Sequence, residues 1–462
     1  MTYAVRDARR LAEFIRTRRW FRSKTRNIAK AEAEDVIPIA GQSARFLIVR
    51  LEYAEGDCDY YVLTDESGNS GQPVEALEDA AFRETLLRAF QGNASYSGQA
   101  GELIFSRTSA FPADAALEKL ESSVSRAEQS NTSVIYGDRF ILKLFRRIEA
   151  GIHPDVEIGT FLTEHGFTHT PAVLGALSYR SRKGDVYSAA ILQQFVPNQG
   201  DAWKYTLESL KEYFDGKPAD DYLHSAALLG RRTAEMHVAL AQGGAPDFEP
   251  EPFTSEDGEK LYQEMLAQAD IAFETLRRKQ AALTGEAAEL AQKVLRLEHR
   301  VTARFAALQD LEVAASRIRF HGDYHLGQVL WTGSDFMIID FEGEPARPLH
   351  ERRTKTLAMR DVAGMLRSFQ YAAYVILFER GVNGETLEQL AADWYDAVGR
   401  EFYAAYVRTA GESAFLPKDP EQQQIVLQSF ILHKALYEVA YEMNNRPDWV
   451  RIPLRGILWL VD

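Results

Sequence analysis

The segment from residue 319 to 353 places strong constraints on the fold of this chain. It contains His-Gly-Asp323, then two short apolar runs separated by Thr-Gly-Ser-Asp at 332–335, and the second run ends on Asp340. Glycine permits a sharp turn in the first motif, and a turn-forming stretch between two strand-like runs predicts a β-hairpin. Asp323 would precede the hairpin and Asp340 would end it, so both carboxylates would meet the amide of Gln328 in one cleft.

This set of side chains fits phosphoryl transfer. One carboxylate takes the proton of the attacking hydroxyl, while a second carboxylate and a neutral oxygen hold Mg2+. Protein kinases use H-R-D-x-x-x-x-N and D-F-G for these tasks. This chain has H-G-D-x-x-x-x-Q and D-F-E. We therefore predict Asp323 as the catalytic base and Gln328 and Asp340 as the magnesium ligands, while His321 and His325 brace the loop.

Composition argues against several other classes of protein. The chain has 462 residues, enough for two or three domains, and a net charge of −14, which disfavours general nucleic-acid binding. Cys58 is the single cysteine, so no intrachain disulfide forms, which suits a reducing compartment. We see no signal-peptide pattern, and no stretch approaches the roughly 20 apolar residues of a membrane span. We expect a cytoplasmic protein with neither nucleic acid nor membrane as a partner.

The His-Gly-Asp form resembles small-molecule kinases of the aminoglycoside phosphotransferase and choline kinase type. The continuation is more specific: E-G-E-P-A-R-P at 342–348 and M-R-D-V-A-G-M at 359–365 resemble the bacterial maltokinases. Those enzymes make maltose 1-phosphate from maltose and ATP. The resemblance implies a two-lobed, protein-kinase-like α+β fold, with ATP and Mg2+ as cofactors and maltose as the acceptor.

Three regions are expected on this basis. Residues 1–90 combine a first helix, strands rich in β-branched residues and a second helix, and they would form a small β-rich N-terminal cap domain. Residues 91–200 would hold an intermediate region and the kinase-like N-lobe with its hinge. Residues 201–462 read as helices around the segment described above, and they would form a mostly helical C-lobe with the catalytic loop and the sugar pocket.

Lys143 lies among apolar residues of a predicted strand, where a lone ammonium is costly to bury. Read alone, it is equally well an edge-strand surface residue. The resemblance pairs it with the ATP phosphates and with Glu157 on the following helix. It also assigns nucleotide contacts to a polar turn and to the hinge, which carry these residues: Ser130, Asn131, Thr132, Ser133, Gln194 and Val196.

The sugar pocket is expected near the C-terminal end of the chain. Tyr437, Glu438, Tyr441 and Glu442 form an adjacent polar and aromatic set, which could equally be an ordinary amphipathic helix with an ion pair. The resemblance implies that Glu438 and Arg446 bind maltose, and Tyr441 offers an aromatic face to a sugar ring.

Two further polar residues are expected to have structural roles. His237 lies near the end of a predicted helix, where we read it as structural and not as a ligand. Asp361 opens another helix, and we expect its carboxylate to cap free N–H groups there.

Direct in-line transfer from ATP to the anomeric hydroxyl of maltose is the expected reaction, and its product would feed glycogen synthesis. Alternatives remain: a kinase for another sugar such as glucosamine, an aminoglycoside phosphotransferase, and a non-catalytic kinase-fold scaffold. Related chains associate with trehalose synthase, which supplies maltose. Such a partner would be a separate chain here.

Overall fold

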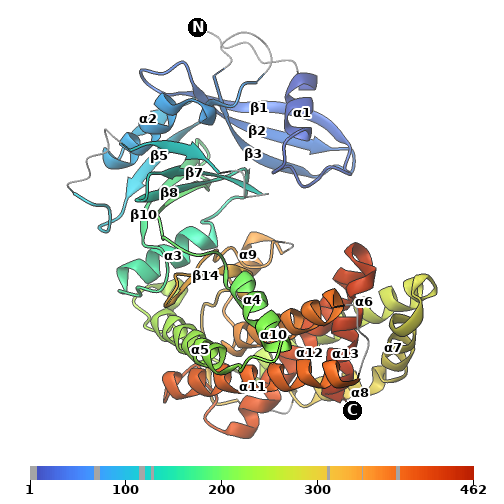
Figure 1. The fold of residues 1–462 in the computed structure, drawn as a ribbon. Helices are drawn as coiled ribbons and strands as arrows, with labels where there is room; N and C mark the ends of the chain where they lie inside the picture. Colours follow the sequence, from blue (N-terminus) through green and yellow to red (C-terminus); the bar gives the residue numbers. More distant parts are fainter. Residues whose placement is uncertain are drawn as a thin grey trace. The chain divides into compact units, whose positions relative to one another are not determined.

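The computed structural model describes residues 8–66, 73–113, 120–125, 130–309, 313–345, 347–380 and 385–461. The chain in Figure 1 divides into two compact units. Unit 1 comprises residues 1–197 with 347–351, and unit 2 comprises residues 198–346 with 352–462. No helix among the described residues is long and apolar enough to cross a membrane.

Unit 1 begins with a four-stranded antiparallel sheet in the order β1-β2-β3-β9. Helix α1 (Ala8–Arg16) lies against this sheet and buries Leu11, Phe14 and Ile15 at helical spacing. Strand β1 is at the edge and ends on Pro38, which cannot donate to a neighbouring strand. The cap strands expected from the sequence are thus confirmed. The bounds are β1 Ile28–Pro38, β2 Arg45–Tyr53, β3 Cys58–Asp65 and β9 Arg147–Ile148.

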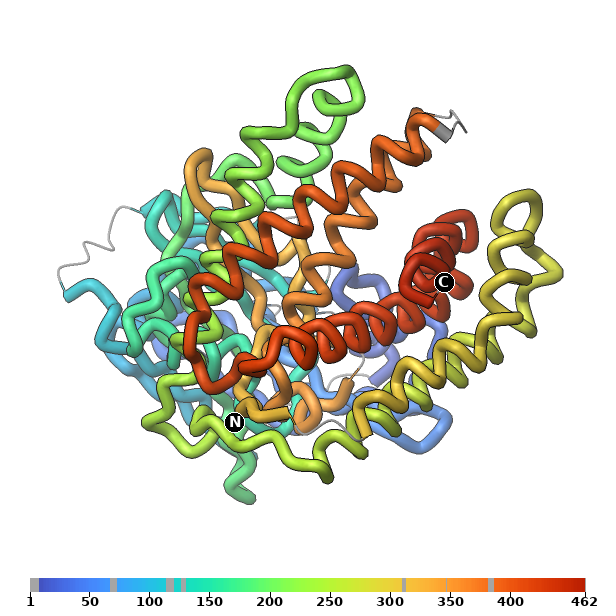
Figure 2. The backbone as a smooth tube through the Cα atoms, turned by 90° about the horizontal axis from the view of Figure 1, so that it is seen from below, coloured from blue at the N-terminus to red at the C-terminus, as the bar shows by residue number. Residues whose placement is uncertain are grey.

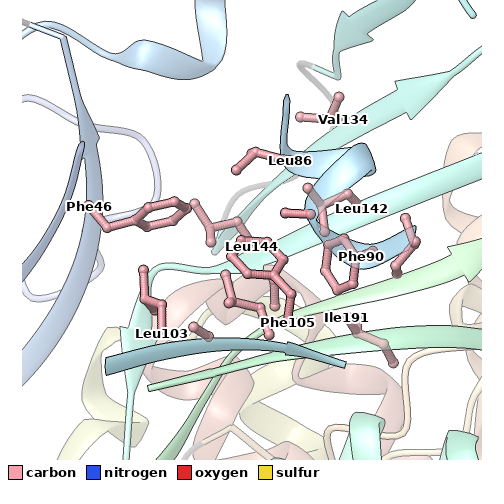
Figure 3. Close-up of a cluster of buried hydrophobic side chains, with 14 of the residues drawn as sticks. Phe46, Leu86, Phe90, Leu103, Phe105, Val134, Leu142, Leu144 and Ile191 are labelled. Carbon is pink, nitrogen blue, oxygen red and sulfur yellow. The ribbon is translucent and has the colours of Figure 1, made fainter. Parts of the chain in front are cut away.

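The second sheet of unit 1 has seven strands in the order β4-β5-β10-β11-β8-β7-β6. Helix α2 (Ala80–Gln91) packs its apolar side on this sheet, and the shared core is drawn in Figure 3. The remaining elements of unit 1 are η1 Ala76–Glu78, β4 Ser95–Ser97, β5 Gly101–Arg107, β6 Ser122–Val124, β7 Asn131–Tyr136, β8 Phe140–Phe145, α3 Pro154–Glu164, β10 Val173–Ser181, β11 Val186–Gln194 and, mostly in this unit, α9 Leu349–Arg352.

The two sheets of unit 1 are joined by β8 and β9. Strand β8 belongs to the second sheet, and β9, two residues later, pairs with β3 of the first sheet. Between them, Arg146 is only 1% exposed and its guanidinium bonds to Glu75 (2.8 Å) and to Thr132 Oγ1 (2.8 Å). The predicted boundary at residue 90 therefore falls inside one compact unit, and it remains a prediction.

Unit 2 is mostly helical. Helix α5 lies along α11, α6 lies along α12, and α7 (yellow in Figure 2) packs on α13 near the end of the chain. The helices are α4 Ala202–Phe214, α5 Asp220–Leu240, α6 Ser255–Lys279, α7 Gly285–Arg296, α8 Glu298–Ala306, α10 Met359–Glu379, α11 Glu385–Ala410, α12 Pro420–Asn445 and α13 Arg451–Val461. Shorter elements are η2 Pro246–Phe248, η3 Gln280–Ala282, η5 Pro447–Trp449 and the pair β12 Glu251–Pro252 with β13 Ser316–Arg317.

The hairpin predicted from the sequence is confirmed. Strand β14 (Val329–Trp331) pairs with β15 (Phe336–Ile338) around the turn at 332–335. Gln328 directly precedes the first strand of the hairpin and ends a short 3-10 helix, η4 (Leu326–Gln328). Helix α10 passes directly beneath the preceding loop, where a Cβ on Gly364 would lie 2.6 Å from the carbonyl oxygen of Tyr324.

Candidate active site

In unit 1, Lys143 lies on strand β8, which pairs with β7 on one side and β11 on the other. Lys143 is therefore not an edge-strand surface residue. Its side chain is 12% exposed, and Nζ lies 3.5 Å from Oδ2 of Asp155, which is 1% exposed. A lysine with so little contact with water requires an anionic partner. The strand therefore presents a largely buried lysine beside a fully buried carboxylate.

Asp155 is a residue that the sequence reasoning missed. It lies in the first turn of α3, which begins at Pro154 after the N-cap residue His153. The predicted partner, Glu157, lies in the same turn and is less buried. Two acids in one helical turn look alike in a sequence, and only the direction of the helix decides which one faces β8. The role of Glu157 beside Lys143 stays a prediction.

The predicted phosphate turn is shorter than expected. Asn131, Thr132 and Ser133 are not in a turn but begin β7, where Ser133 lies opposite Lys143. The β-branched and aromatic residues that follow them extend the strand back over these polar residues. Ser130 stays in the segment between β6 and β7, of which 126–129 lie outside the described residues. Contacts of all four residues with phosphate remain predictions.

The predicted hinge follows β11. The backbone N–H of Gln194 donates to the carbonyl of Ala172 (2.9 Å), and that of Phe195 donates to the carbonyl of Arg139 (2.8 Å). These two donors are therefore used inside unit 1. Nucleotide contacts at Gln194 and Val196 remain predictions, and at Gln194 such a contact would use its carbonyl or its side chain.

In unit 2, the His-Gly-Asp loop (residues 320–325) is anchored from beneath by Asp361. The carboxylate of Asp361, 2% exposed, accepts hydrogen bonds from the backbone N–H of His321 (2.7 Å) and of Gly322 (3.0 Å). Gly322 has φ +89°, a left-handed conformation that glycine adopts without strain. The loop is thus fixed at the two residues that precede Asp323.

The expected capping role of Asp361 is wrong. Helix α10 has Ala358 at its N-cap with no side-chain cap, and Asp361 points to the loop instead. Oδ2 of Asp361 also lies 3.1 Å from Nε2 of His237. Nδ1 of the same histidine lies 2.9 Å from the hydroxyl of Tyr406. Burial alone would raise the pKa of Asp361, but the hydrogen bond from His237 and the neighbouring groups hold it below its ordinary value. His237 is structural, as predicted.

The two histidines of the loop have bracing contacts. His321 is 1% exposed, and its Nε2 lies 2.9 Å from the carbonyl of Ile339 at the end of the hairpin. Nδ1 of His325 accepts from the N–H of Gly327 (3.0 Å), while its Nε2 lies 3.9 Å from Oδ2 of Asp323. Burial lowers the pKa of His325 below its ordinary value. Both histidines therefore position Asp323, in agreement with the prediction.

Asp340 directly follows the hairpin in a strained backbone conformation. Its φ is +69°, and among the described residues only Asn93 is another non-glycine with a positive φ. Such conformations cost free energy and are concentrated at functional sites. A carboxylate oxygen of Asp340 lies within 4.8 Å of one of Glu342, an acid that the sequence reasoning passed over. Gln328 lies beside this strand end, because its carbonyl accepts from the N–H of Ile339 (3.0 Å). Carboxylate and amide oxygens are ligands of the kind Mg2+ prefers.

Helix α12 presents a polar stripe that begins beside the base. Nζ of Lys434 lies 3.6 Å from Oδ1 of Asp323 and 4.8 Å from the ring centroid of Tyr437. The hydroxyl of Tyr437 bonds to Glu344, and burial raises the pKa of Tyr437. One position further, Glu438 is bound by the buried Arg367 of α10, whose Nε donates at 2.9 Å.

The other predicted sugar-binding residues lie at the C-terminal end of α12, with Tyr441 inside the helix and Arg446 as its C-cap residue. Arg446 makes a two-point ion pair with Glu442 (2.9 and 2.7 Å), not with Glu438. Its guanidinium lies over the rings of Trp449 (4.4 Å) and Tyr441 (5.6 Å). Tyr441 is 45% exposed, so a face of this cluster is open to solvent. Burial raises the pKa of Glu442 above its ordinary value even though Arg446 opposes this.

A lysine on the sheet paired with a buried carboxylate, an anchored His-Gly-Asp loop and an aspartate after the hairpin are the parts of a kinase. The model of the phosphotransferase enzyme family (APH) matches residues 123–370, more than half of the chain. The chain therefore belongs to this family. It is a phosphotransferase that uses an alcohol group as acceptor, similar to sugar kinases, and it has the predicted kinase-like fold.

Two curated relatives support this assignment. A glucosamine kinase of Streptacidiphilus jiangxiensis is 26% identical over 382 residues, which cover 82% of this chain and 76% of the relative. A glucosamine kinase of Mycolicibacterium smegmatis (strain ATCC 700084 / mc(2)155) is 25% identical over 340 residues, covering 72% and 78%.

Solved structures are similar over almost the whole chain. A glucosamine kinase in complex with glucosamine, ADP and inorganic phosphate has a TM-score of 0.70 at 22% identity, covering 92% of this chain and 93% of that one. Crystal form A of a glucosamine kinase also has a TM-score of 0.70, at 21% identity. These matches are to the fold.

Proposed function

We propose that this chain is an ATP-dependent sugar kinase. The observation that carries the proposal is Asp323, a partly exposed carboxylate on a loop whose backbone is anchored by Asp361. A base in this position orients the acceptor hydroxyl and takes its proton late in transfer. The rest of the site then supplies charge for the nucleotide.

In the proposed reaction, a sugar oxygen forms a bond to the γ-phosphorus of ATP as the bond to the β–γ bridging oxygen breaks. ADP leaves, and Asp323 receives the hydroxyl proton. Lys143 would bind phosphate oxygens, held in position by Asp155. Asp340, with Gln328 and Glu342, would hold Mg2+, since all three offer oxygen ligands. Bound Mg2+ would neutralise charge on the triphosphate.

The charge pattern near Asp323 favours a neutral acceptor. Three carboxylates of this region already have a cation: Asp323 has Lys434, Glu438 has Arg367 and Glu442 has Arg446. An acceptor with an ammonium group gains most from a carboxylate without such a partner. We therefore take maltose, phosphorylated at its anomeric hydroxyl, as the first candidate. Its product, maltose 1-phosphate, would serve α-glucan synthesis, and a separate trehalose synthase chain would supply the maltose.

Glucosamine is the second candidate, and the relatives favour it over maltose. Both curated relatives described above are glucosamine kinases. One structural feature also suits an amino sugar: Glu344, which bonds to the hydroxyl of Tyr437, adds a carboxylate to the same region. A carboxylate attracts an ammonium group.

The test is ADP release with ATP and Mg2+, offering maltose, glucose, glucosamine and kanamycin separately. Asp323→Asn should lose at least about 100-fold in kcat, as removal of a general base does. Turnover of maltose alone supports the first candidate, and turnover of glucosamine alone supports the second. If the folded chain binds ATP but phosphorylates none of these compounds, the proposal is wrong and the scaffold interpretation gains support.

A further inference from the structure

Helix α12 brings a cation to the catalytic base from a distant part of the chain. Nζ of Lys434 lies 3.6 Å from Oδ1 of Asp323, although the two residues are far apart in sequence. The other carboxylate oxygen of Asp323 faces His325, whose ring nitrogen lies 3.9 Å away. Nζ of Lys434 is the nearer of the two nitrogens, and it carries an ammonium charge.

The ammonium group is itself held in place. It lies 4.8 Å from the ring centroid of Tyr437, one turn further along α12, which is a cation–π distance. Tyr437 is fixed in turn by its bond to Glu344, a residue of the segment that follows Asp340. Lys434 is therefore oriented by two contacts, the carboxylate of Asp323 and the face of Tyr437, and is not a freely rotating surface lysine.

We propose that Lys434 is a positioning residue for phosphoryl transfer. It holds Oδ1 of Asp323 so that Oδ2 faces the acceptor hydroxyl, and it offsets the charge of Asp323 as the anionic phosphoryl group approaches. This inference rests on the proposed function. It also gives Lys434 a part in specificity, because an ammonium group on the acceptor, placed beside the attacking hydroxyl, would be repelled by Nζ.

An ordinary surface ion pair is the competing explanation, and it makes a different prediction. Lys434 is 32% exposed and Asp323 is 23% exposed, so the pair is solvated enough to add little to folding stability. A surface pair can therefore be removed with little effect on stability or rate. Substitution of a positioning residue lowers kcat but leaves folding stability and ATP affinity unchanged.

The experiment compares Lys434→Met, Lys434→Arg and Lys434→Ala with the wild-type chain on its best sugar. Lys260→Met is the matched control, because Lys260 forms an exposed ion pair with Glu256 (2.8 Å) on α6. We expect Lys434→Met to lower kcat about 10- to 100-fold with KM for ATP within about 2-fold, and Lys434→Arg to recover part of the loss. Added ethylammonium should raise the kcat of Lys434→Ala but not of the control.

Wild-type kcat in Lys434→Met, or a loss that neither arginine nor ethylammonium restores, would overturn the inference while leaving the proposed function intact. A wild-type chain that phosphorylates no sugar would overturn both. Circular dichroism and ATP binding on each variant separate these outcomes from a folding defect.

Discussion

Arg367 on α10 and Glu438 on α12 form a buried ion pair in which Nε and Nη2 of the arginine both donate to Oε2 of the glutamate. The side chains are 1% and 11% exposed. The same guanidinium bonds to Gln370, and a Cβ on Gly456 of α13 would lie 2.3 Å from Nη1. Three helices therefore meet at this one cation, next to the predicted sugar-binding residues.

Replacing Arg367 should damage both stability and acceptor binding. Arg367→Met leaves the carboxylate of Glu438 buried without a cation, which we expect to lower the free energy of unfolding by about 3 kcal/mol or more. The double variant Arg367→Met/Glu438→Leu removes both charges and should recover much of this loss, yet it should keep a raised KM for the sugar. Urea unfolding and acceptor kinetics check the two effects. Equal KM values in the double variant and the wild-type chain would contradict a sugar-binding role for Glu438.

The free energy of unfolding should depend on pH because of Asp361. Its pKa is lower in the folded chain than in the unfolded one, so its contribution is complete above the unfolded value, about 3.9, and is lost as pH falls through the lower folded value. In Asp361→Asn, the N–H groups of His321 and Gly322 lose a charged acceptor, and we expect a loss of about 2 kcal/mol at pH 7. The variant should also lose less stability than the wild-type chain between pH 5 and pH 3 in urea titrations. Parallel curves would show that Asp361 does not account for the acid sensitivity.

Lys143 should matter for the nucleotide and not for the sugar. Lys143→Met should raise KM for ATP about 10-fold or more, because a charge-assisted contact contributes about 1.5–3 kcal/mol. Asp155→Asn should have a smaller effect in the same direction, since it removes the charge that orients Lys143. Lys183→Met, on the exposed turn after β10, is the matched control. The same assay on Glu157→Gln compares the two acids, and a larger effect there than in Asp155→Asn would favour the partner predicted from the sequence.

Glu342 should contribute to magnesium binding beside Asp340. Glu342→Gln should raise the Mg2+ concentration for half-maximal activity about 10-fold, while Asp340→Asn should abolish activity at all Mg2+ concentrations. Titration of Mg2+ at saturating ATP and sugar measures the first effect. Glu256→Gln, on the exposed surface of α6, is the control. An unchanged Mg2+ dependence in Glu342→Gln would restrict the metal site to Asp340 and Gln328.

Sequence reasoning recovered the parts of the fold that depend on neighbouring residues. The hairpin around residues 332–335, strand β8 with Lys143 and the edge strand ending at Pro38 all follow from local periodicity and turn chemistry. The same local pattern places Asp323 before the hairpin and Asp340 after it, while their roles in catalysis and magnesium binding remain predictions. These features are local because the side-chain pattern of each strand or turn is complete within a few residues.

Contacts between distant segments escaped prediction. Asp361 looked like a helix cap because an acid at a helix start commonly is one, whereas its carboxylate bonds to a loop 39 residues earlier. Lys434 and Arg367 reach the site from α12 and α10, and no spacing in the sequence pairs them with Asp323 and Glu438. The positive φ of Asp340 is likewise not indicated by the residue pattern, which at a non-glycine residue predicts a negative φ.

The two-residue strand β9 limits which segments of this enzyme can be expressed or exchanged separately. The segment that matches the family model, 123–370, contains β9 and Arg146 but neither Glu75 nor strand β3, which complete their contacts. Expressed alone, it would leave Arg146 without its carboxylate partner and β9 without its neighbouring strand, and it would also lack all of α12. Residues 123–370 are therefore not expected to fold as an independent domain. New acceptor specificities are better sought by exchanging α12 within the intact chain than by shuffling whole domains.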